Sequence, residues 1–212
     1  MPYANPRQCL VTLDVEGVLT PEIWVALADA FDIAALRRTT QHESNYRLLM
    51  QGRIDTLTQH EITVPQIRAV IAELRPLDGA KGFLDSLRRE VQVVLLSDTF
   101  EQFIGPLMAQ LSYPTILCHR LDISDSRIVG FEPRIEHQKQ RAVEGFRAMN
   151  FAVVAAGDSY NDLHMLDAAD RGLLFAAPES IRRERADLQA LDSYAELTAA
   201  IRAACAELTS DH

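Results

Sequence analysis

Two aspartates follow apolar runs at opposite ends of the chain, and each belongs to a short acidic motif. Asp14 lies in the sequence Leu-Asp-Val-Glu-Gly-Val-Leu, and Asp158 lies in Gly-Asp-Ser-Tyr-Asn-Asp. A carboxylate just past a buried strand lies at the carboxyl edge of a sheet, where open α/β folds bind their ligands. The two motifs are therefore predicted to share one acidic site that requires a cation.

The residues beside these aspartates favour chemistry at the same edge. Glu16 is two residues after Asp14, so at the end of a strand both side chains point the same way. Paired carboxylates suit a nucleophile with a proton donor, or a hard metal ion. In the second motif, Gly157 allows a sharp turn, and Asp162 falls on the first turn of the next helix. Each motif taken alone also has a structural explanation, as a turn or a helix cap.

Two more polar residues lie beside predicted strands. Ser97 follows an apolar run, where a hydroxyl near helix amides can hydrogen-bond a phosphate oxygen. Lys139, one of only two lysines with Lys81, opens a predicted helix, where an ammonium can neutralise phosphate and restrain the acids. Taken singly, a helix cap and a solvated surface lysine are the better explanations of these two residues.

The elements that must position these residues alternate between strand and helix. Continuous apolar runs have the composition of strands buried on both faces of a parallel sheet, and segments with helical periodicity separate them. This order predicts a doubly wound, mainly parallel α/β sheet with a Rossmann-like core. The predicted strands span residues 9–15, 91–96, 115–118, 152–156 and 172–175, and the predicted helices 81–90, 100–111, 138–149, 161–169 and 194–208.

Residues 21–76 interrupt the alternation, because they contain no strand-like run. Roughly fifty residues of helix are too many for one crossover connection. We therefore expect a helical cap at 21–76, inserted into a catalytic core made of 1–20 and 77–212. Residues 120–132 alternate and contain turn residues, which predicts a β-hairpin flap. Within the cap, helices are predicted at 22–31, 42–60 and 64–74.

The composition argues against several classes of protein. A formal net charge of −9 without a basic stripe disfavours binding to nucleic acid or an anionic membrane. No apolar run approaches the roughly 20 residues of a membrane span, and residues 1–8 do not form a signal peptide, so we expect a cytoplasmic protein. Cys9, Cys118 and Cys205 are scattered, and all three are predicted to be ordinary thiols. The sequence leaves both a monomer and a homodimer open.

The four motifs occur in order along the whole chain, each at or beside a predicted strand. In this arrangement they resemble the haloacid dehalogenase (HAD) superfamily of aspartyl-phosphate phosphohydrolases. Within that superfamily, the chain is similar to the ThrH-type phosphoserine phosphatases/homoserine phosphotransferases. The segments that carry this resemblance are 13–19, 21–24, 95–100 and 155–162.

The resemblance implies a role for each acidic residue. Asp14 would be the nucleophile, and Glu16 would protonate the leaving alcohol and then activate the acceptor. Mg²⁺ would be held by the Asp14 carboxylate, the Glu16 backbone carbonyl and Asp158, while Asp162 would orient this metal site. Three residues would hold the phosphate group: Ser97, Lys139 and Asn161.

The resemblance extends to the predicted cap. Glu22 matches the acid that binds the substrate ammonium, Arg53 matches the carboxylate-binding arginine, and Tyr46 falls where an aromatic ring walls the pocket. Two residues depart from the common phosphoserine phosphatase pattern. Glu16 replaces an aspartate, and Asp98 replaces a glycine beside the phosphate-binding serine, which adds a negative charge among the substrate-binding residues.

The motifs and this resemblance together imply a magnesium-dependent phosphoserine phosphatase that acts through an aspartyl phosphate, and the ThrH-type likeness further implies homoserine as a second phosphoryl acceptor. One alternative is a HAD phosphatase for another small phosphomonoester. A second is a receiver-like phospho-signalling module, which also arranges carboxylates, a hydroxyl and a lysine around an aspartyl phosphate. The length of the predicted cap and the late Gly-Asp motif count against this second alternative. The intact motifs likewise count against a non-catalytic scaffold on the same fold.

Overall fold

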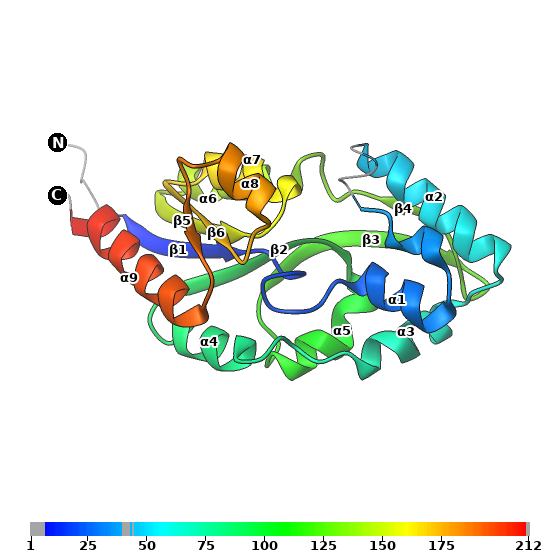
Figure 1. Cartoon of the computed structure of the whole chain (residues 1–212). Helices are drawn as coiled ribbons and strands as arrows, with labels where there is room; N and C mark the ends of the chain where they lie inside the picture. Colours follow the sequence, from blue (N-terminus) through cyan, green and yellow to red (C-terminus); the bar gives the residue numbers. More distant parts are fainter. Residues whose placement is uncertain (1–6, 40–42, 44, 211–212) are drawn as a thin grey trace.

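The computed structural model describes residues 7–39, 43 and 45–210, and at its centre is a seven-stranded sheet (Figure 1). The strand order is β4-β3-β2-β1-β5-β6-β7, and all neighbouring strands are parallel except β3 and β4. The strands are β1 (Gln8–Leu13), β2 (Gln92–Phe100), β3 (Ile116–Ser124), β4 (Arg127–Glu132), β5 (Phe151–Gly157), β6 (Arg171–Phe175) and β7 (Gln189–Leu191).

Helices cover both faces of this sheet (Figure 1). In chain order the described residues form α1 (Ile23–Phe31), α2 (Tyr46–Gln59), α3 (Val64–Glu73), α4 (Ala80–Leu87), α5 (Glu101–Gln110), α6 (Gln138–Ala148), α7 (Leu163–Ala168), α8 (Glu179–Glu184) and α9 (Tyr194–Ser210), with 3₁₀ turns η1 (Ala34–Arg37) and η2 (Tyr160–Asp162). Successive strand residues point to opposite faces. Leu10 and Val153 accordingly pack with α6, α7 and α8, whereas Val11 and Val154 pack in a core that includes α4, α5 and α9. The predicted doubly wound α/β sheet is confirmed.

The described part of residues 21–76 forms three α-helices, α1 to α3, and no named strand, as expected. Helix α2 begins at Tyr46, later than predicted, because the Asn45 side chain caps it by accepting hydrogen bonds from the N–H groups of Arg47 and Leu48. The earlier part of the helix predicted from residue 42 includes positions that lie outside the described residues. The division into a core of 1–20 and 77–212 and a cap of 21–76 stays a prediction.

Strands β3 and β4 form the predicted hairpin, with Arg120 opposite Glu132. The strand predicted at 115–118 and the first hairpin strand are one continuous strand, β3. Similarly, β2 continues to Phe100 and includes Ser97, which was expected to follow the strand. The register between β2 and β3 shifts between Leu96 and Phe100, and such irregularities re-aim side chains at the end of a strand. Helix α8 and strand β7 were not predicted, because each is too short to show a clear periodicity.

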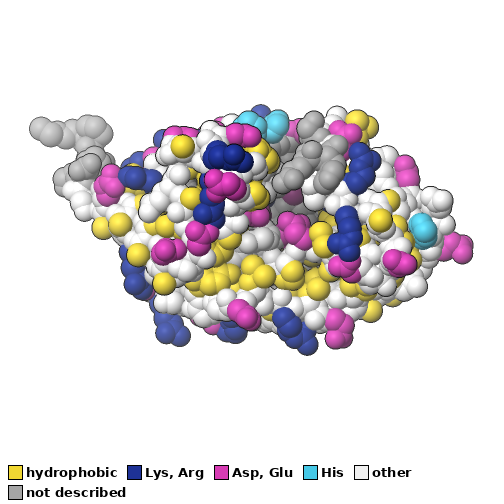
Figure 2. Space-filling view, viewed as in Figure 1, with side chains coloured by type: hydrophobic (Ala, Val, Ile, Leu, Met, Phe, Trp, Pro, Cys, Tyr) yellow, Lys and Arg dark blue, Asp and Glu magenta, His cyan; other side chains and the backbone are white. Residues whose placement is uncertain are grey.

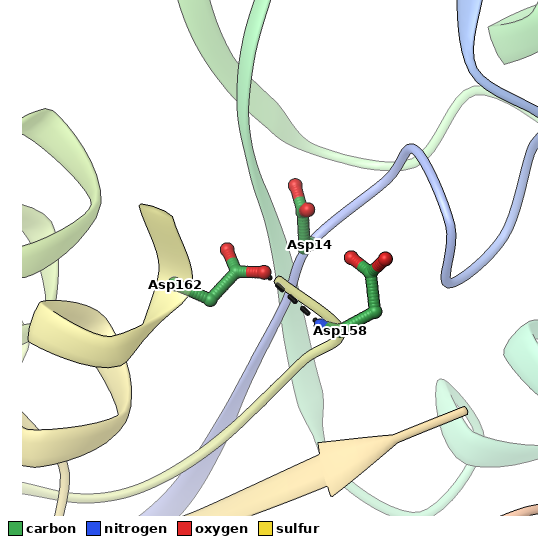
Figure 3. Close-up of side chains that lie close together, drawn as sticks. All are labelled: Asp14, Asp158 and Asp162. Atoms are coloured by element: carbon green, nitrogen blue, oxygen red, sulfur yellow. Dashed lines mark hydrogen bonds between the residues drawn. The ribbon is translucent and has the colours of Figure 1, made fainter. Parts of the chain in front are cut away.

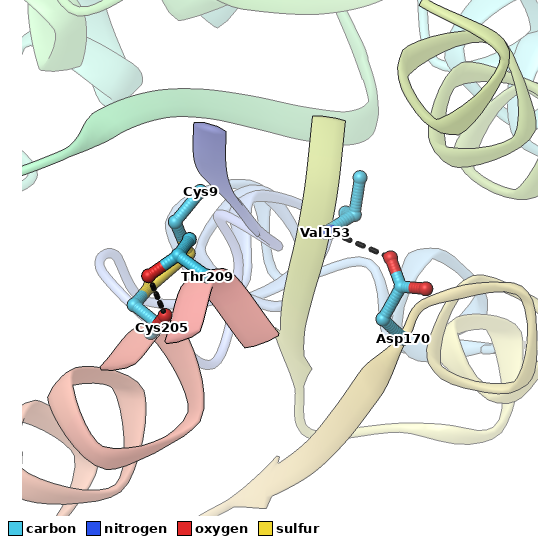
Figure 4. Close-up of a disulfide and its surroundings, with 5 residues drawn as sticks. All are labelled: Cys9, Val153, Asp170, Cys205 and Thr209. Atoms are coloured by element: carbon cyan, nitrogen blue, oxygen red, sulfur yellow. Dashed lines mark hydrogen bonds between the residues drawn. A yellow bond between two sulfur atoms is a disulfide. The ribbon is translucent and has the colours of Figure 1, made fainter. Parts of the chain in front are cut away.

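The prediction of three ordinary thiols is wrong. A disulfide joins Cys9 in β1 to Cys205 in α9, with the two Cα atoms 5.5 Å apart (Figure 4). Cys118 is free and buried. The two bonded cysteines are 196 residues apart and meet only because α9 packs against β1, so no local pattern could have paired them. Because disulfides are rare in cytosolic proteins, this pair weighs against the predicted cytoplasmic location, which stays a prediction.

The surface agrees with the acidic, mixed composition. In Figure 2, acidic side chains are interspersed with Lys and Arg over the face in view, without a continuous basic stripe. None of the helices within the described part of the chain combines the length and the apolar composition that a membrane span requires.

Replacing both bonded cysteines, in the variant Cys9→Ser/Cys205→Ser, should lower the free energy of unfolding by about 2–4 kcal/mol, because the disulfide restricts the unfolded chain over a long loop. Urea unfolding under non-reducing conditions measures this loss. Alkylation of the denatured wild type, followed by mass spectrometry, should label Cys118 alone before reduction and all three cysteines after it. Three labels before reduction would contradict the disulfide.

Candidate active site

Adjacent strands bring the two acidic motifs together. In the register of β1 and β5, Leu13 pairs with Ala156, and the N–H group of Asp14 donates to the Ala156 carbonyl at 3.0 Å. Both strands end at this point, so Asp14 and Asp158 emerge at the same edge of the sheet (Figure 3). One carboxylate oxygen each from Asp14, Asp158 and Asp162 lie within 4.8 Å of one another. The structure thus places the two motifs in one acidic cluster.

Two glycines make this close approach feasible. Gly17 has a φ of +79°, and a Cβ atom there would lie 2.5 Å from the Asp158 Cγ. A Cβ atom at Gly157 would lie 2.5 Å from the Asp162 Cγ. A larger residue at either position would therefore displace one of the clustered carboxylates.

Asp162 is fully buried, and hydrogen bonds occupy both of its oxygens. Its Oδ2 accepts from the backbone N–H groups of Asp158 and Ser159 at 3.1 Å each, which fixes the turn that carries Asp158. Its Oδ1 accepts from the Lys139 Nζ at 2.8 Å. Asp162 is therefore engaged by the protein itself and holds its neighbours in place.

The Lys139 ammonium joins the two halves of the cluster from the first turn of α6. Its Nζ lies 2.8 Å from Asp14 Oδ1, 2.8 Å from Asp162 Oδ1 and 3.8 Å from Asp98 Oδ2, and the side chain is 4% exposed. Burial lowers the pKa of Lys139, but the carboxylates of Asp14 and Asp162 outweigh this effect and hold the pKa above its usual range. The lysine therefore stays charged.

One ammonium does not balance the negative charge around it. Burial, together with the Asp162 carboxylate, raises the pKa of Asp158 to about 7 and raises that of Asp14 above its usual range. The Oδ1 atom of Asp158 is buried and has no hydrogen-bond partner among the described residues. A cluster of oxygen donors with excess negative charge and a spare buried oxygen fits a hard divalent cation.

Glu16 lies at the start of the turn after β1, close to Glu22. Its Oε2 accepts a hydrogen bond from the Ile23 N–H at 3.1 Å. Burial, followed by the proximity of Glu22, raises the pKa of Glu16 to about 8. A carboxyl group with such a pKa carries a proton at neutral pH, as a general acid requires.

A cavity of about 170 Å³ adjoins this cluster. It joins the acidic edge of the sheet to side chains of the helical segment between β1 and β2. Asp162 is not among its lining residues, but the other predicted site residues all line it: Asp14, Glu16, Glu22, Tyr46, Arg53, Ser97, Asp98, Lys139, Asp158 and Asn161.

Arg53 is an oriented cation in this cavity. Its guanidinium carbon lies 4.4 Å from the centre of the Trp24 ring, and its Nη2 donates to the Arg38 carbonyl at 2.7 Å. Its Nε is buried and has no hydrogen-bond partner in the part of the chain that the structure describes. Burial lowers the pKa of Arg53 to about 10, which still leaves it charged at neutral pH. Trp24 was not predicted as a site residue, because a single tryptophan on a helix is equally typical of a hydrophobic core residue.

Asp98 is held by the protein on several sides. Its carbonyl accepts from the Tyr46 hydroxyl at 2.7 Å, its Oδ2 accepts from the Asn161 amide at 3.0 Å, and its Oδ1 lies 3.3 Å from His119 Nε2. Burial raises the pKa of Asp98, but Lys139 and the hydrogen bonds from His119 and Asn161 outweigh burial and hold the pKa well below its usual range. The added negative charge at this position is therefore compensated.

His119 was missed from the sequence. It directly follows the strand predicted at 115–118, so the rule that ligands gather at the carboxyl edge of a parallel sheet could have found it. Ser97, which was predicted, is buried, and its Oγ accepts from the Thr99 N–H at 3.2 Å.

Residues 15–167 match the family described as haloacid dehalogenase-like hydrolase. The chain belongs to this family. It is 47% identical to phosphoserine phosphatase ThrH of Pseudomonas aeruginosa, over 89% of this chain and 92% of that protein. It is 45% identical to a phosphoserine phosphatase of Pseudomonas syringae pv. tomato, over 89% of this chain and 80% of that protein. The resemblance drawn from the motifs is confirmed.

Solved structures share the fold of this HAD-family chain. A phospho-aspartyl intermediate analogue of phosphoserine phosphatase superposes with a TM-score of 0.76 at 19% identity, covering 91% of this chain and 98% of that one. A substrate-bound phosphoserine phosphatase complex gives a TM-score of 0.75 at 19% identity, covering 92% and 99%. At such identities the likeness establishes the fold, and it confirms the predicted HAD-like core.

Lys139→Met should lower the free energy of unfolding, measured in urea without divalent cations, by about 3–5 kcal/mol, because Asp14 and Asp162 would stay buried without their cation. The only other lysine provides a matched control. Lys81 is half exposed and pairs with Asp85, so Lys81→Met should leave the stability nearly unchanged. Equal losses in the two variants would contradict the role assigned to the buried lysine.

Proposed function

We propose that this HAD-family chain is a magnesium-dependent phosphoserine phosphatase that acts through an aspartyl phosphate on Asp14. One observation carries the proposal: a single cavity is lined both by the acid pair Asp14 and Glu16 and by the charged pair Glu22 and Arg53. The first pair suits phosphoryl transfer, and the second suits the ammonium and carboxylate groups of an amino acid. The relatives named as phosphoserine phosphatases support the same substrate.

The chain's own residues account for both halves of the reaction. The Asp14 carboxylate would form a bond to phosphorus while the bond to the serine oxygen breaks, and Glu16 would give its proton to that oxygen. Glu16 would then take a proton from the water that attacks the phosphoryl group, which releases phosphate and restores Asp14. The groups that would bind and orient the phosphoryl oxygens are Ser97, Lys139 and Asn161.

The residues present fit a magnesium ion, as the spare buried oxygen of Asp158 supports. Asp14, Asp158 and the Glu16 backbone carbonyl would hold the ion, and Asp162 would orient them through its hydrogen bonds. When bound, the ion would offset the negative charge of the carboxylates and the phosphoryl group.

The cap belongs to the same proposal. Residues 21–76 would form a cap domain that supplies Glu22, Tyr46 and Arg53 to recognise the amino acid, while 1–20 and 77–212 would form the catalytic core. An acceptor alcohol with the same ammonium and carboxylate groups would use the same contacts. Homoserine is such an alcohol, so we propose it as a second acceptor in competition with water.

A phosphorus NMR time course with phosphoserine and Mg²⁺ tests the reaction. Wild-type protein should convert phosphoserine to inorganic phosphate, and added homoserine should divert part of the signal to phosphohomoserine. Asp14→Asn should abolish both products, because it removes the nucleophile. Absence of both products in the wild type would refute the proposal, and turnover by Asp14→Asn would refute the assignment of the nucleophile.

Recognition of the carboxylate can be tested separately from the chemistry. Arg53→Met should lower kcat/KM for phosphoserine by about 10- to 100-fold, because it removes a charged hydrogen-bond donor. It should change kcat/KM for phosphoethanolamine much less, since that substrate lacks the carboxylate. Arg53→Lys keeps the charge without the planar fork, so its kcat/KM for phosphoserine should lie between those of the wild type and Arg53→Met. Equal losses with both substrates would refute carboxylate binding by Arg53.

A further inference from the structure

We propose that His119 is a positioning residue for phosphoryl transfer: its imidazole fixes the Asp98 carboxylate, which in turn fixes Asn161 and Lys139. This inference rests on the proposed function, in which Asn161 and Lys139 hold the phosphate. It adds a residue outside the four motifs. It also assigns a role to Asp98, which departs from the usual family pattern, as the link between His119 and the phosphate-binding groups.

The hydrogen bonds of His119 define where its proton lies. The backbone N–H of Arg134 donates to His119 Nδ1 at 3.2 Å, so Nδ1 is an acceptor. In a neutral imidazole the proton then resides on Nε2, which lies 3.3 Å from Asp98 Oδ1. His119 therefore links a backbone amide on one side to a carboxylate on the other.

The imidazole ring is also held firmly in place. His119 is 4% exposed, and its ring centre lies 5.8 Å from that of Tyr46 and 6.3 Å from that of Phe100. The residue that donates to it is itself anchored, because the Arg134 Nε donates to the Cys118 carbonyl at 2.9 Å. A ring fixed by packing and by the main chain can in turn fix the carboxylate that it contacts.

Asp98 transmits this constraint to the phosphate-binding groups. Its Oδ1 faces His119, while its Oδ2 accepts from the Asn161 amide and lies 3.8 Å from the Lys139 ammonium. Without the His119 donor, Oδ1 would lose its partner and the carboxylate would be free to rotate away from Asn161. A partly buried acceptor without its donor costs free energy, so the carboxylate should move and the affinity for phosphate should fall.

The contacts with the amino acid should not be affected in the same way. Within the described residues, the Arg53 guanidinium contacts Trp24, Met50 and Arg38, and neither His119 nor Asp98. Tyr46 does adjoin His119, but its hydroxyl donates to the backbone carbonyl of Asp98, and this hydrogen bond does not require the imidazole donor. The proposal therefore predicts selective weakening: inorganic phosphate should bind less tightly, while serine should bind as before.

Two substitutions separate the functions of the two ring nitrogens. His119→Asn keeps an acceptor near the position of Nδ1 for the Arg134 N–H but removes the donor to Asp98. His119→Gln keeps a donor near the position of Nε2. His60→Asn, at an exposed position at the end of α2, is the control for the loss of a histidine.

Calorimetric titration with inorganic phosphate and with serine, both in the presence of Mg²⁺, measures the two halves of the site without turnover. His119→Asn should weaken phosphate binding by about tenfold, which is about 1.4 kcal/mol, and leave serine binding unchanged. His119→Gln and His60→Asn should stay within about twofold of the wild type for both ligands. With phosphoserine, His119→Asn should lower kcat/KM by about tenfold, whereas His119→Gln should keep it within about twofold of the wild-type value.

Three results would overturn the inference. These are equal phosphate affinity in wild type and His119→Asn, equal weakening of phosphate and serine binding, and equal behaviour of the Asn and Gln variants. If His119→Asn does not fold, the tautomer of His119 in the wild type provides the test. ¹⁵N NMR should show the proton on Nε2, and a proton on Nδ1 would overturn the inference. A wild type that binds phosphate but does not hydrolyse phosphoserine would refute the proposed function alone.

Discussion

The interaction on which the active site depends is the contact of one buried ammonium with the carboxylates around it. Lys139 reaches from α6 to Asp14, which directly follows β1, and to Asp162 in η2, and therefore ties together three segments of the chain. Placing carboxylates side by side in a dry site costs free energy, because each repels the other and loses its hydration. The lysine offsets only part of that cost. The remainder makes the site selective for ligands that bring positive charge, as a divalent cation does.

The parallel sheet supplies the geometry that this charge cluster needs. Neighbouring parallel strands end at the same edge, so residues more than a hundred positions apart meet without any long loop. The close approach of the two motifs then depends on the absence of side chains at Gly17 and Gly157, where a Cβ atom would meet a carboxylate. The positions of the clustered carboxylates thus depend jointly on the buried ammonium, the strand order and the two glycines. A change in any of these three would displace the carboxylates.

Much of this arrangement could be predicted from the sequence because it is local. Recognisable strands precede Asp14, Glu16 and Asp158. The geometry at the end of a strand fixes the direction of the side chains that follow it. Features that depend on packing between distant elements could not be predicted. The disulfide requires α9 to pack against β1, and the contact between Trp24 and Arg53 requires two helices to meet. The fixed state of the Asp98 carboxylate likewise depends on partners from β3 and η2.

The scarcity of lysine has a practical consequence for handling the protein. One lysine side chain, Lys139, is enclosed by carboxylates, whereas the other, Lys81, lies half exposed on α4. Amine-reactive dyes and surfaces will therefore find a single accessible lysine on the folded chain, and that lysine does not line the cavity. A fluorophore or a solid support attached there leaves the acidic edge of the sheet open to ligands. The same enclosure that keeps Lys139 charged thus also protects it from chemical labelling.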